Sequence, residues 1–152
     1  MTNPAQPAHP SHPDLHARIE ASFVRQGMMQ HLGARLVSVA PGEVEIALPY
    51  SERVTQQQGG YHGGAMGALA DIAGGYAGLT MAAEGQEVTT VEYKINFLAA
   101  FQGGELRARG HVVRAGKRLI ITTAEVVHLD DNGGESPCAL MQQTLATVNK
   151  TY

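Results

Sequence analysis

Cysteine is nearly absent from this sequence, which has one, Cys138, among 152 residues. A single cysteine excludes an internal disulfide, and a chain of this length buries enough surface to fold without a disulfide or a structural metal. Because Cys138 lies in a strand-like run, we interpret it as a buried structural thiol rather than a catalytic one. This use of cysteine fits a reducing cytosol, so we expect a cytoplasmic protein.

An excess of positive charge is also missing, since the formal net charge is −3 and the isoelectric point is near 6.1. We therefore expect no nucleic-acid partner. Residues 1–13 lack the apolar segment of a signal peptide. Four prolines interrupt this stretch, so we expect a flexible tail rather than a metal site built from His9, His12 and His16.

No apolar run in the sequence fits a membrane span. The nearest, residues 65–83, consists mainly of small apolar residues but contains several glycines and one carboxylate, Asp71. These features argue against a helix that faces lipid, and we expect no membrane association. A helix that is apolar on all sides is buried, and its small residues let other backbones approach closely. We therefore expect this helix at the centre of the protein.

The remaining sequence predicts one helix and six strands. Leu15, Ile19 and Phe23 predict a helix that Asp14 caps and that runs to about Met29. Alternating apolar residues and turn signals predict strands at 34–39, 43–48, 88–98, 105–113, 119–129 and 138–148. This order predicts a single α+β domain over residues 14–152, with an antiparallel sheet wrapped around the long central helix.

Asp71 is the only charged residue in the central apolar helix. A carboxylate with no cation nearby in the sequence is costly to bury, and desolvation makes it a stronger base. Asp71 is therefore a candidate general base or nucleophile. A structural aspartate that is satisfied by hydrogen bonds remains the alternative.

His62, Gly63 and Gly64 stand where the central helix begins. Free N–H groups and the positive end of the helix dipole favour a developing negative oxygen there, and glycine lets a substrate approach the backbone. The alternative is a plain helix start with glycines for packing. Asp71 follows His62 by nine residues, which places it about 13 Å along the helix and on the opposite face. If both groups act on one carbonyl, the site is shared between two subunits, so we expect a dimer.

Three segments carry a resemblance to a known family: residues 59–64, residues 69–71 and residues 90–98. On the basis of these segments, the chain from about Phe23 to Val148 resembles the PaaI-type thioesterases of the hotdog superfamily. The resemblance implies a hotdog fold and hydrolysis of an aryl or medium-chain acyl-CoA to free acid and CoA. It implies no cofactor, because coenzyme A is part of the substrate, and assembly as a homodimer or a homotetramer built as a dimer of dimers.

The resemblance also implies catalytic roles. Asp71 would be the nucleophile or general base, and the Gly63 N–H would polarise the thioester carbonyl. His62 would orient that loop or contact the thioester sulfur. Thr90, which strict alternation places on the same strand face as Glu92, would position water. Gln56 stands where the family usually has asparagine, with an amide that reaches farther.

The substrate-binding residues expected from the resemblance fall in two groups. Gly59 and Gly64 would line the substrate near the helix start. Arg114, Lys117 and Arg118 flank a turn and would hold the phosphates of CoA, although a solvated charged turn is the alternative.

Two other functions compete with the thioesterase interpretation. A non-catalytic acyl-CoA-binding hotdog protein is favoured by Gln56 and disfavoured by Asp71. A hydratase of the same fold would need an aspartate and a histidine a few residues apart in one loop, and the sequence contains no such pair.

Overall fold

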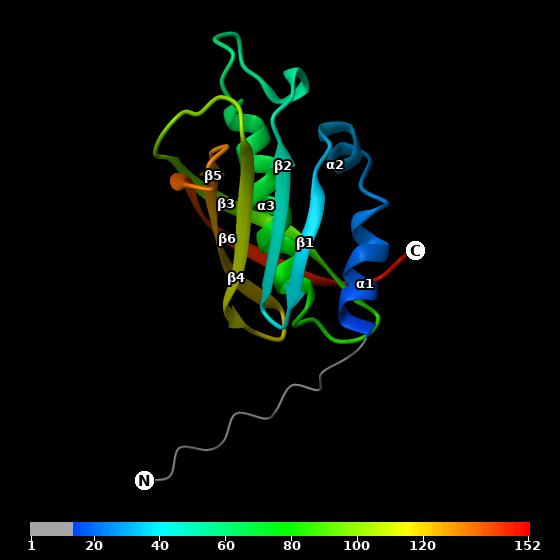
Figure 1. Ribbon diagram of the computed structural model, residues 1–152. Helices are drawn as coiled ribbons and strands as arrows, with labels where there is room; N and C mark the ends of the chain where they lie inside the picture. The colour runs from blue at the N-terminus through cyan, green and yellow to red at the C-terminus, as the bar shows by residue number, and fades with distance from the viewer. Residues whose placement is uncertain (1–13) are drawn as a thin grey trace.

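The computed structural model describes residues 14–152, so the tail expected over residues 1–13 lies outside the described residues. The helices are α1 (Asp14–Phe23), α2 (Gly27–Leu32), the short 3-10 helix η1 (Glu52–Val54) and α3 (Gly63–Leu79). The strands are β1 (Arg35–Ala40), β2 (Glu43–Pro49), β3 (Gln86–Phe97), β4 (Glu105–Ala115), β5 (Leu119–Leu129) and β6 (Glu135–Asn149). They form one antiparallel sheet in the order β1-β2-β4-β5-β6-β3 (Figure 1). The predicted α+β order is confirmed for the strands and the central helix.

The N-terminal helical region differs from the prediction of one helix to about Met29. The chain instead forms α1 and α2, because Gln26 takes an extended conformation with φ −80° and ψ 96°. The next residue, Gly27, is also a poor helix former. Phe23 at the end of α1 and Met29 in α2 are both buried, so the break lets both helices contribute to the core.

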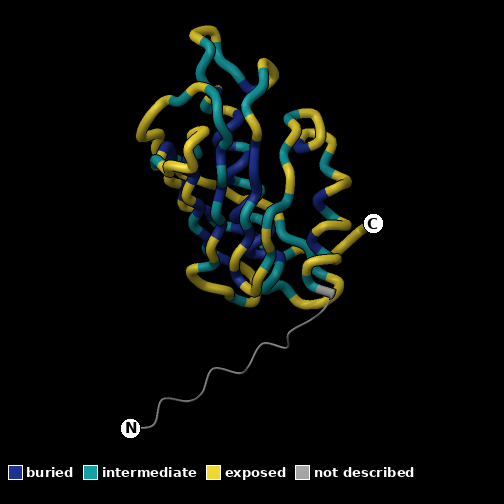
Figure 2. The backbone as a smooth tube through the Cα atoms, viewed as in Figure 1, coloured by how far each residue is buried: buried dark blue, intermediate teal, exposed yellow. Residues whose placement is uncertain are grey.

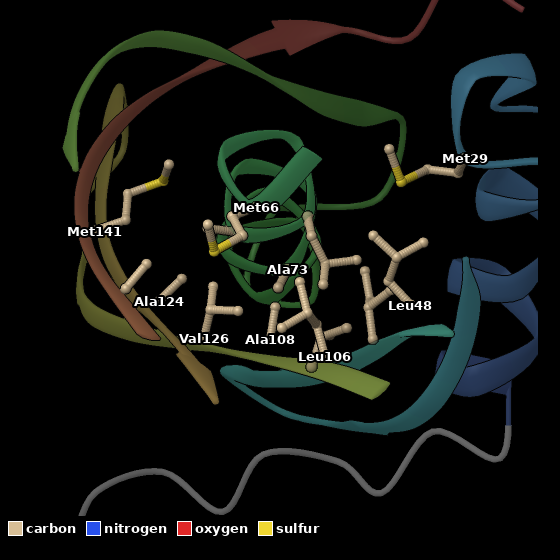
Figure 3. Packing of buried hydrophobic residues seen from close by; sticks show 14 of the residues in the cluster. Met29, Leu48, Met66, Ala73, Leu106, Ala108, Ala124, Val126 and Met141 are labelled. Carbon is tan, nitrogen blue, oxygen red and sulfur yellow. The ribbon is translucent and has the colours of Figure 1, made fainter. Parts of the chain in front are cut away.

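The central helix α3 lies inside the curved sheet, as expected. Figure 3 shows α3 with side chains from several strands around it, among them Leu48 of β2, Ala108 of β4, Val126 of β5 and Met141 of β6. Figure 2 shows buried residues along the central strands, whereas the loops consist mainly of exposed and intermediate residues. No helix within residues 14–152 combines the length and apolar character that crossing a membrane requires.

Small residues bring the backbone of α3 into direct contact with the sheet. A Cβ atom added to Gly110 of β4 would lie 2.1 Å from the carbonyl oxygen of Ala73 in α3. No residue larger than glycine fits there without moving the helix. The predicted close packing of the central helix is therefore confirmed.

A β-bulge in the edge strand β3 corrects the predicted alternation. Thr90 pairs with Leu145 and Glu92 pairs with Thr144, so the register slips by one residue at Val91. Because paired residues share a face of the sheet, Thr90 faces the core side with Leu145, and Glu92 faces the other side. The prediction that Thr90 and Glu92 share a face was wrong, because a bulge inserts one residue into the period of two.

Cys138 is fully buried in β6, and its Sγ lies 3.2 Å from the carbonyl oxygen of Val126. The interpretation of a buried thiol is confirmed, whereas the cytoplasmic location stays a prediction. Burial raises the pKa of Cys138 to about 11.

We predict that Cys138 resists iodoacetamide in the native protein at pH 8, because the thiolate is the reactive form and is scarce below a pKa of about 11. In urea the thiol regains its ordinary pKa near ~8.5 and should be alkylated rapidly. Mass spectrometry of timed samples measures both rates. Equal labelling of native and unfolded protein would contradict the buried assignment.

Candidate active site

One face of α3 is left partly uncovered by the sheet, and the candidate site lies along it. Its residues recur at helical spacing: Ala68, Asp71, Ile72 and Gly75. Strand β3 runs along this face. Thr90 contacts Asp71 through a hydrogen bond, and the ring of Phe97 would lie 3.2 Å from a Cβ added to Gly63. Strand β3 thus lies next to both parts of α3 that the sequence analysis predicted to be functional, the helix start at Gly63 and the carboxylate of Asp71.

The carboxylate of Asp71 is held by hydrogen bonds rather than by a cation. Its Oδ1 accepts from the Thr90 hydroxyl at 2.7 Å and from the side-chain amide of Gln143. Among residues 14–152, no donor contacts its Oδ2, and no cation pairs with it. The sequence led us to expect a buried carboxylate, but Asp71 is only half-buried in the single chain. One oxygen is therefore fixed, and the other remains available.

Gln143 of β6 belongs to this cluster, although the sequence analysis did not single it out. It is 1% exposed. Its Nε2 also donates to the carbonyl of Asp71 at 3.2 Å and to the Thr90 hydroxyl at 3.1 Å. Its strand neighbours on the same face, Met141 and Leu145, are apolar and buried. A polar residue at a buried position of an alternating strand was the signal that could have identified it.

His62 is the N-cap of α3. Its backbone is extended, with φ −70° and ψ 135°, and its Nδ1 accepts the N–H of Gly64 at 2.7 Å. The neutral ring therefore carries its proton on Nε2. The Gly63 N–H precedes the intrahelical bonds of α3 and has no acceptor within residues 14–152. The helix start thus presents a free N–H at its positive end.

Hydrogen bonds from three segments fix the chain just before α3. The N–H of His62 donates to the carbonyl of Val54 at 2.7 Å, and the N–H of Tyr61 donates to the carbonyl of Phe101 at 2.9 Å. The Gln56 side chain accepts from the N–H of Gln58. Gly59, with φ +88°, occupies the turn and hydrogen bonds to the Gln56 carbonyl. Both residues shape this loop, and the catalytic role of Gln56 and the substrate-binding role of Gly59 stay predictions.

The two parts of the site are separated along α3. Gly63 begins the helix and Asp71 stands eight residues later, so they lie about 12 Å apart along the axis. His62 precedes the helix, so its predicted position on the opposite helical face does not apply. Gly63 and Asp71 both lie beside β3. The axial distance alone keeps one carbonyl carbon from reaching both groups of one chain.

The three predicted phosphate-binding cations are exposed at the β4–β5 turn. Arg114 lies near the end of β4, and Lys117 and Arg118 lie in the turn that follows. None of the three forms an ion pair with a residue of the described chain. Ile120, just after the turn, packs near Gly78, so the cations lie toward the C-terminal end of α3.

A groove of about 410 Å³ opens beside Asp71 and Thr90. It follows α3 past Ile72 to Tyr76, whose hydroxyl accepts from the Gln26 side chain at 3.0 Å. Its size falls within the ~300–1,000 Å³ range of small-molecule sites. In residues 14–152, no three histidine, cysteine or acidic side chains gather in a group that could hold a metal ion.

Comparisons with known proteins agree on one family. The thioesterase superfamily model matches residues 58–135. A thioesterase family protein from Silicibacter pomeroyi is 36% identical, with a TM-score of 0.86 over 90% of this chain and 99% of that chain. The proofreading thioesterase EntH of Klebsiella pneumoniae is 31% identical over 70% of this chain and 76% of its own length.

The E. coli PaaI protein from the phenylacetic acid degradation operon supports the fold. Its structure matches 91% of this chain and 96% of its own with a TM-score of 0.79, at 22% identity. The expected hotdog fold and the resemblance to PaaI-type proteins are thereby confirmed. The chain is a thioester hydrolase that belongs to the thioesterase superfamily.

Proposed function

We propose that this enzyme hydrolyses an acyl-CoA thioester to a free acid and coenzyme A. The observation that carries the proposal is the Asp71 carboxylate beside the groove, whose Oδ1 is held by Thr90 and Gln143 while no donor within residues 14–152 contacts Oδ2. Such an oxygen acts either as the base that removes a proton from water or as the nucleophile that attacks the carbonyl. The groove takes the acyl group, aryl or medium-chain.

The start of α3 stabilises the oxyanion in this proposal. The free N–H of Gly63 donates to the carbonyl oxygen as negative charge develops, and the helix dipole adds to the stabilisation. Nε2–H of His62 is available to the thioester sulfur because Nδ1 is occupied by Gly64. Gly64 therefore supports the site through its N–H bond to His62.

The remaining proposed contacts concern coenzyme A. Arg114, Lys117 and Arg118 are exposed and free of ion pairs within the described chain, which suits them to phosphate. Coenzyme A enters as part of the substrate, so the mechanism requires no cofactor.

A second copy of the chain completes the site in this proposal. Strand β3 is at the sheet edge, and three of its large apolar side chains are exposed, namely Val91 at 58%, Tyr93 at 45% and Phe97 at 53%. A long, exposed apolar edge strand is a template for pairing with another chain. Pairing β3 with its symmetric copy covers both edges and brings a second α3 to the open face, so that Gly63 of one subunit can serve Asp71 of the other. The homodimer is the minimum unit, and a dimer of dimers is the larger one.

The first prediction concerns Asp71→Asn. The substitution keeps the shape of the side chain but removes the base and nucleophile, so kcat for an acyl-CoA should fall by roughly 10²–10⁴. The melting temperature should stay or rise, because a partly buried charge is removed. Thiol release from a panel of aryl and medium-chain acyl-CoAs measures kcat.

The contrasting variant for Asp71→Asn is the double substitution Lys117→Ala with Arg118→Ala. These cations lie far from the reacting carbon, so their loss should raise KM and leave kcat nearly unchanged. Normal turnover by Asp71→Asn, with lowered stability, would assign Asp71 a structural role. Tight acyl-CoA binding without turnover in the wild type would identify a binding protein.

The second prediction separates the two roles of His62. Asparagine is a good N-cap, so His62→Asn should keep the stability of α3, whereas His62→Ala should cost about 1 kcal/mol. Both should lower kcat, because neither offers the Nε2–H. Chemical denaturation and thiol release measure the two effects. If His62→Asn turns over like the wild type, His62 acts only as the cap.

The third prediction concerns assembly. Val91→Glu places a charge on the exposed apolar edge of β3 and should shift the dimer toward inactive monomer. Val113→Glu is the matched control, because Val113 is 59% exposed and also lies at a register shift, but on β4 inside the sheet. Sedimentation velocity measures the oligomeric state of both variants, and thiol release measures their activity. A fully active wild-type monomer would refute the shared site.

A further inference from the structure

We propose that Gln143 is the positioning residue that fixes the orientation of the Asp71 carboxylate, so that one oxygen is held and the other acts on the substrate. The inference rests on the proposed function of Asp71, and it assigns a role to a buried amide that lies outside the matched motifs. Gln143 contacts Asp71 through both the carboxylate Oδ1 and the backbone carbonyl. It therefore ties the side chain and the helix backbone to the same strand, β6.

The orientation of the Gln143 amide is set by Thr122 of β5. The Thr122 hydroxyl donates to Oε1 of Gln143 at 2.8 Å, and the two residues are direct partners across the β5–β6 pair. This leaves Nε2, the donor end, facing Asp71. A flipped amide would place Oε1 against the carboxylate, where two acceptors repel. Thr122 thus prevents the flip.

Thr90 closes the cluster. Its hydroxyl donates to Oδ1 of Asp71 at 2.7 Å and accepts from Nε2 of Gln143 at 3.1 Å. Oδ1 therefore receives two donors, and Oδ2 receives none from the described chain. Rotating the carboxylate by half a turn breaks both bonds and re-forms them to the other, equivalent oxygen, so one oxygen is held by the two donors and the other is left for the groove that Asp71 lines.

Gly74 leaves the room that this arrangement needs. A Cβ atom at position 74 would lie 2.3 Å from Oε1 of Gln143 and 2.9 Å from Oγ1 of Thr122. Any side chain there would displace the amide. Glycine at position 74, one turn of α3 beyond Asp71, is therefore needed for Gln143 to reach Asp71.

The test compares Gln143→Leu and Gln143→Glu with the same substitutions at Gln142, the exposed neighbour on the other face of β6. Gln143→Leu removes the donor, so kcat should fall on the order of 10–100-fold with KM nearly unchanged, as misplaced groups typically cause. Gln143→Glu places a second carboxyl beside Asp71, and the acid limb of the kcat/KM–pH profile should move up by about one unit or more. The Gln142 variants should match the wild type.

The other charged or titratable groups that line the groove are Arg25, Glu87, Tyr76 and Tyr152. None of them changes in these variants, so a moved acid limb reports on Asp71 and its new neighbour. Thr122→Val removes the hydroxyl that orients the Gln143 amide, so it should lower kcat, as Gln143→Leu does. Thr122→Ser keeps the hydroxyl and should restore turnover.

The outcomes separate this inference from the proposed function. If the wild type hydrolyses acyl-CoA and the Gln143 variants lose only stability, with turnover per folded molecule and pH profile unchanged, the positioning role is overturned. If the wild type hydrolyses no acyl-CoA, the proposed function fails. The carboxyl ¹³C signal of Asp71, assigned with Asp71→Asn, then decides the positioning role. A higher titration midpoint in Gln143→Glu than in the wild type supports it, and identical midpoints overturn it.

Discussion

Direct packing of the α3 backbone against the sheet is the constraint on which the other features depend. Gly110 permits it at β4, and Gly74 permits it next to β5 and β6. Because so little side-chain volume separates helix from sheet, an amide on β6 can reach both the carboxylate and the backbone carbonyl of Asp71. A helix of larger residues would lie farther out, and the hydrogen bonds between Gln143 and Asp71 would be lost. The glycines of α3 thus serve the active site through packing.

The edge strand β3 joins three parts of the protein. Its bulge at Val91 turns Thr90 toward Asp71, and its Phe97 ring lies close to Gly63. Its outer edge pairs with no other strand of the described residues. Bulges are common beside active sites because one extra residue re-aims a side chain without changing the strand direction. The same strand therefore contributes to the carboxylate cluster, the start of α3 and the proposed dimer contact.

The carboxylate of Asp71 illustrates how an acidic side chain is held on an apolar helix by hydrogen bonds, with no cation from the described chain beside it. Two donors satisfy Oδ1, and the partial exposure of the residue leaves Oδ2 in contact with the groove. A hydrogen-bonded carboxylate keeps its orientation, whereas a carboxylate in an ion pair would have its charge offset by the partner. The same hydrogen bonds therefore support both interpretations of Asp71. They satisfy the carboxylate, as a structural role requires, and they also fix its orientation, as a catalytic role requires.

The sequence by itself determined the α+β class, the central position of α3 and the two motifs at its start and middle. It could do so because hydrophobic periodicity and the small residues of 65–83 act locally and leave a clear pattern. The break between α1 and α2 was missed, since the apolar stripe continues through the turn at Gln26. The orientation of Thr90 was also missed, because a bulge depends on the register against β6 and strict alternation does not contain it. Only the tertiary structure brought Gln143 to Asp71 and Thr122 to Gln143. These residues lie on β6 and β5, far from Asp71 in sequence, and sheet pairing together with the close approach of α3 decides whether they meet.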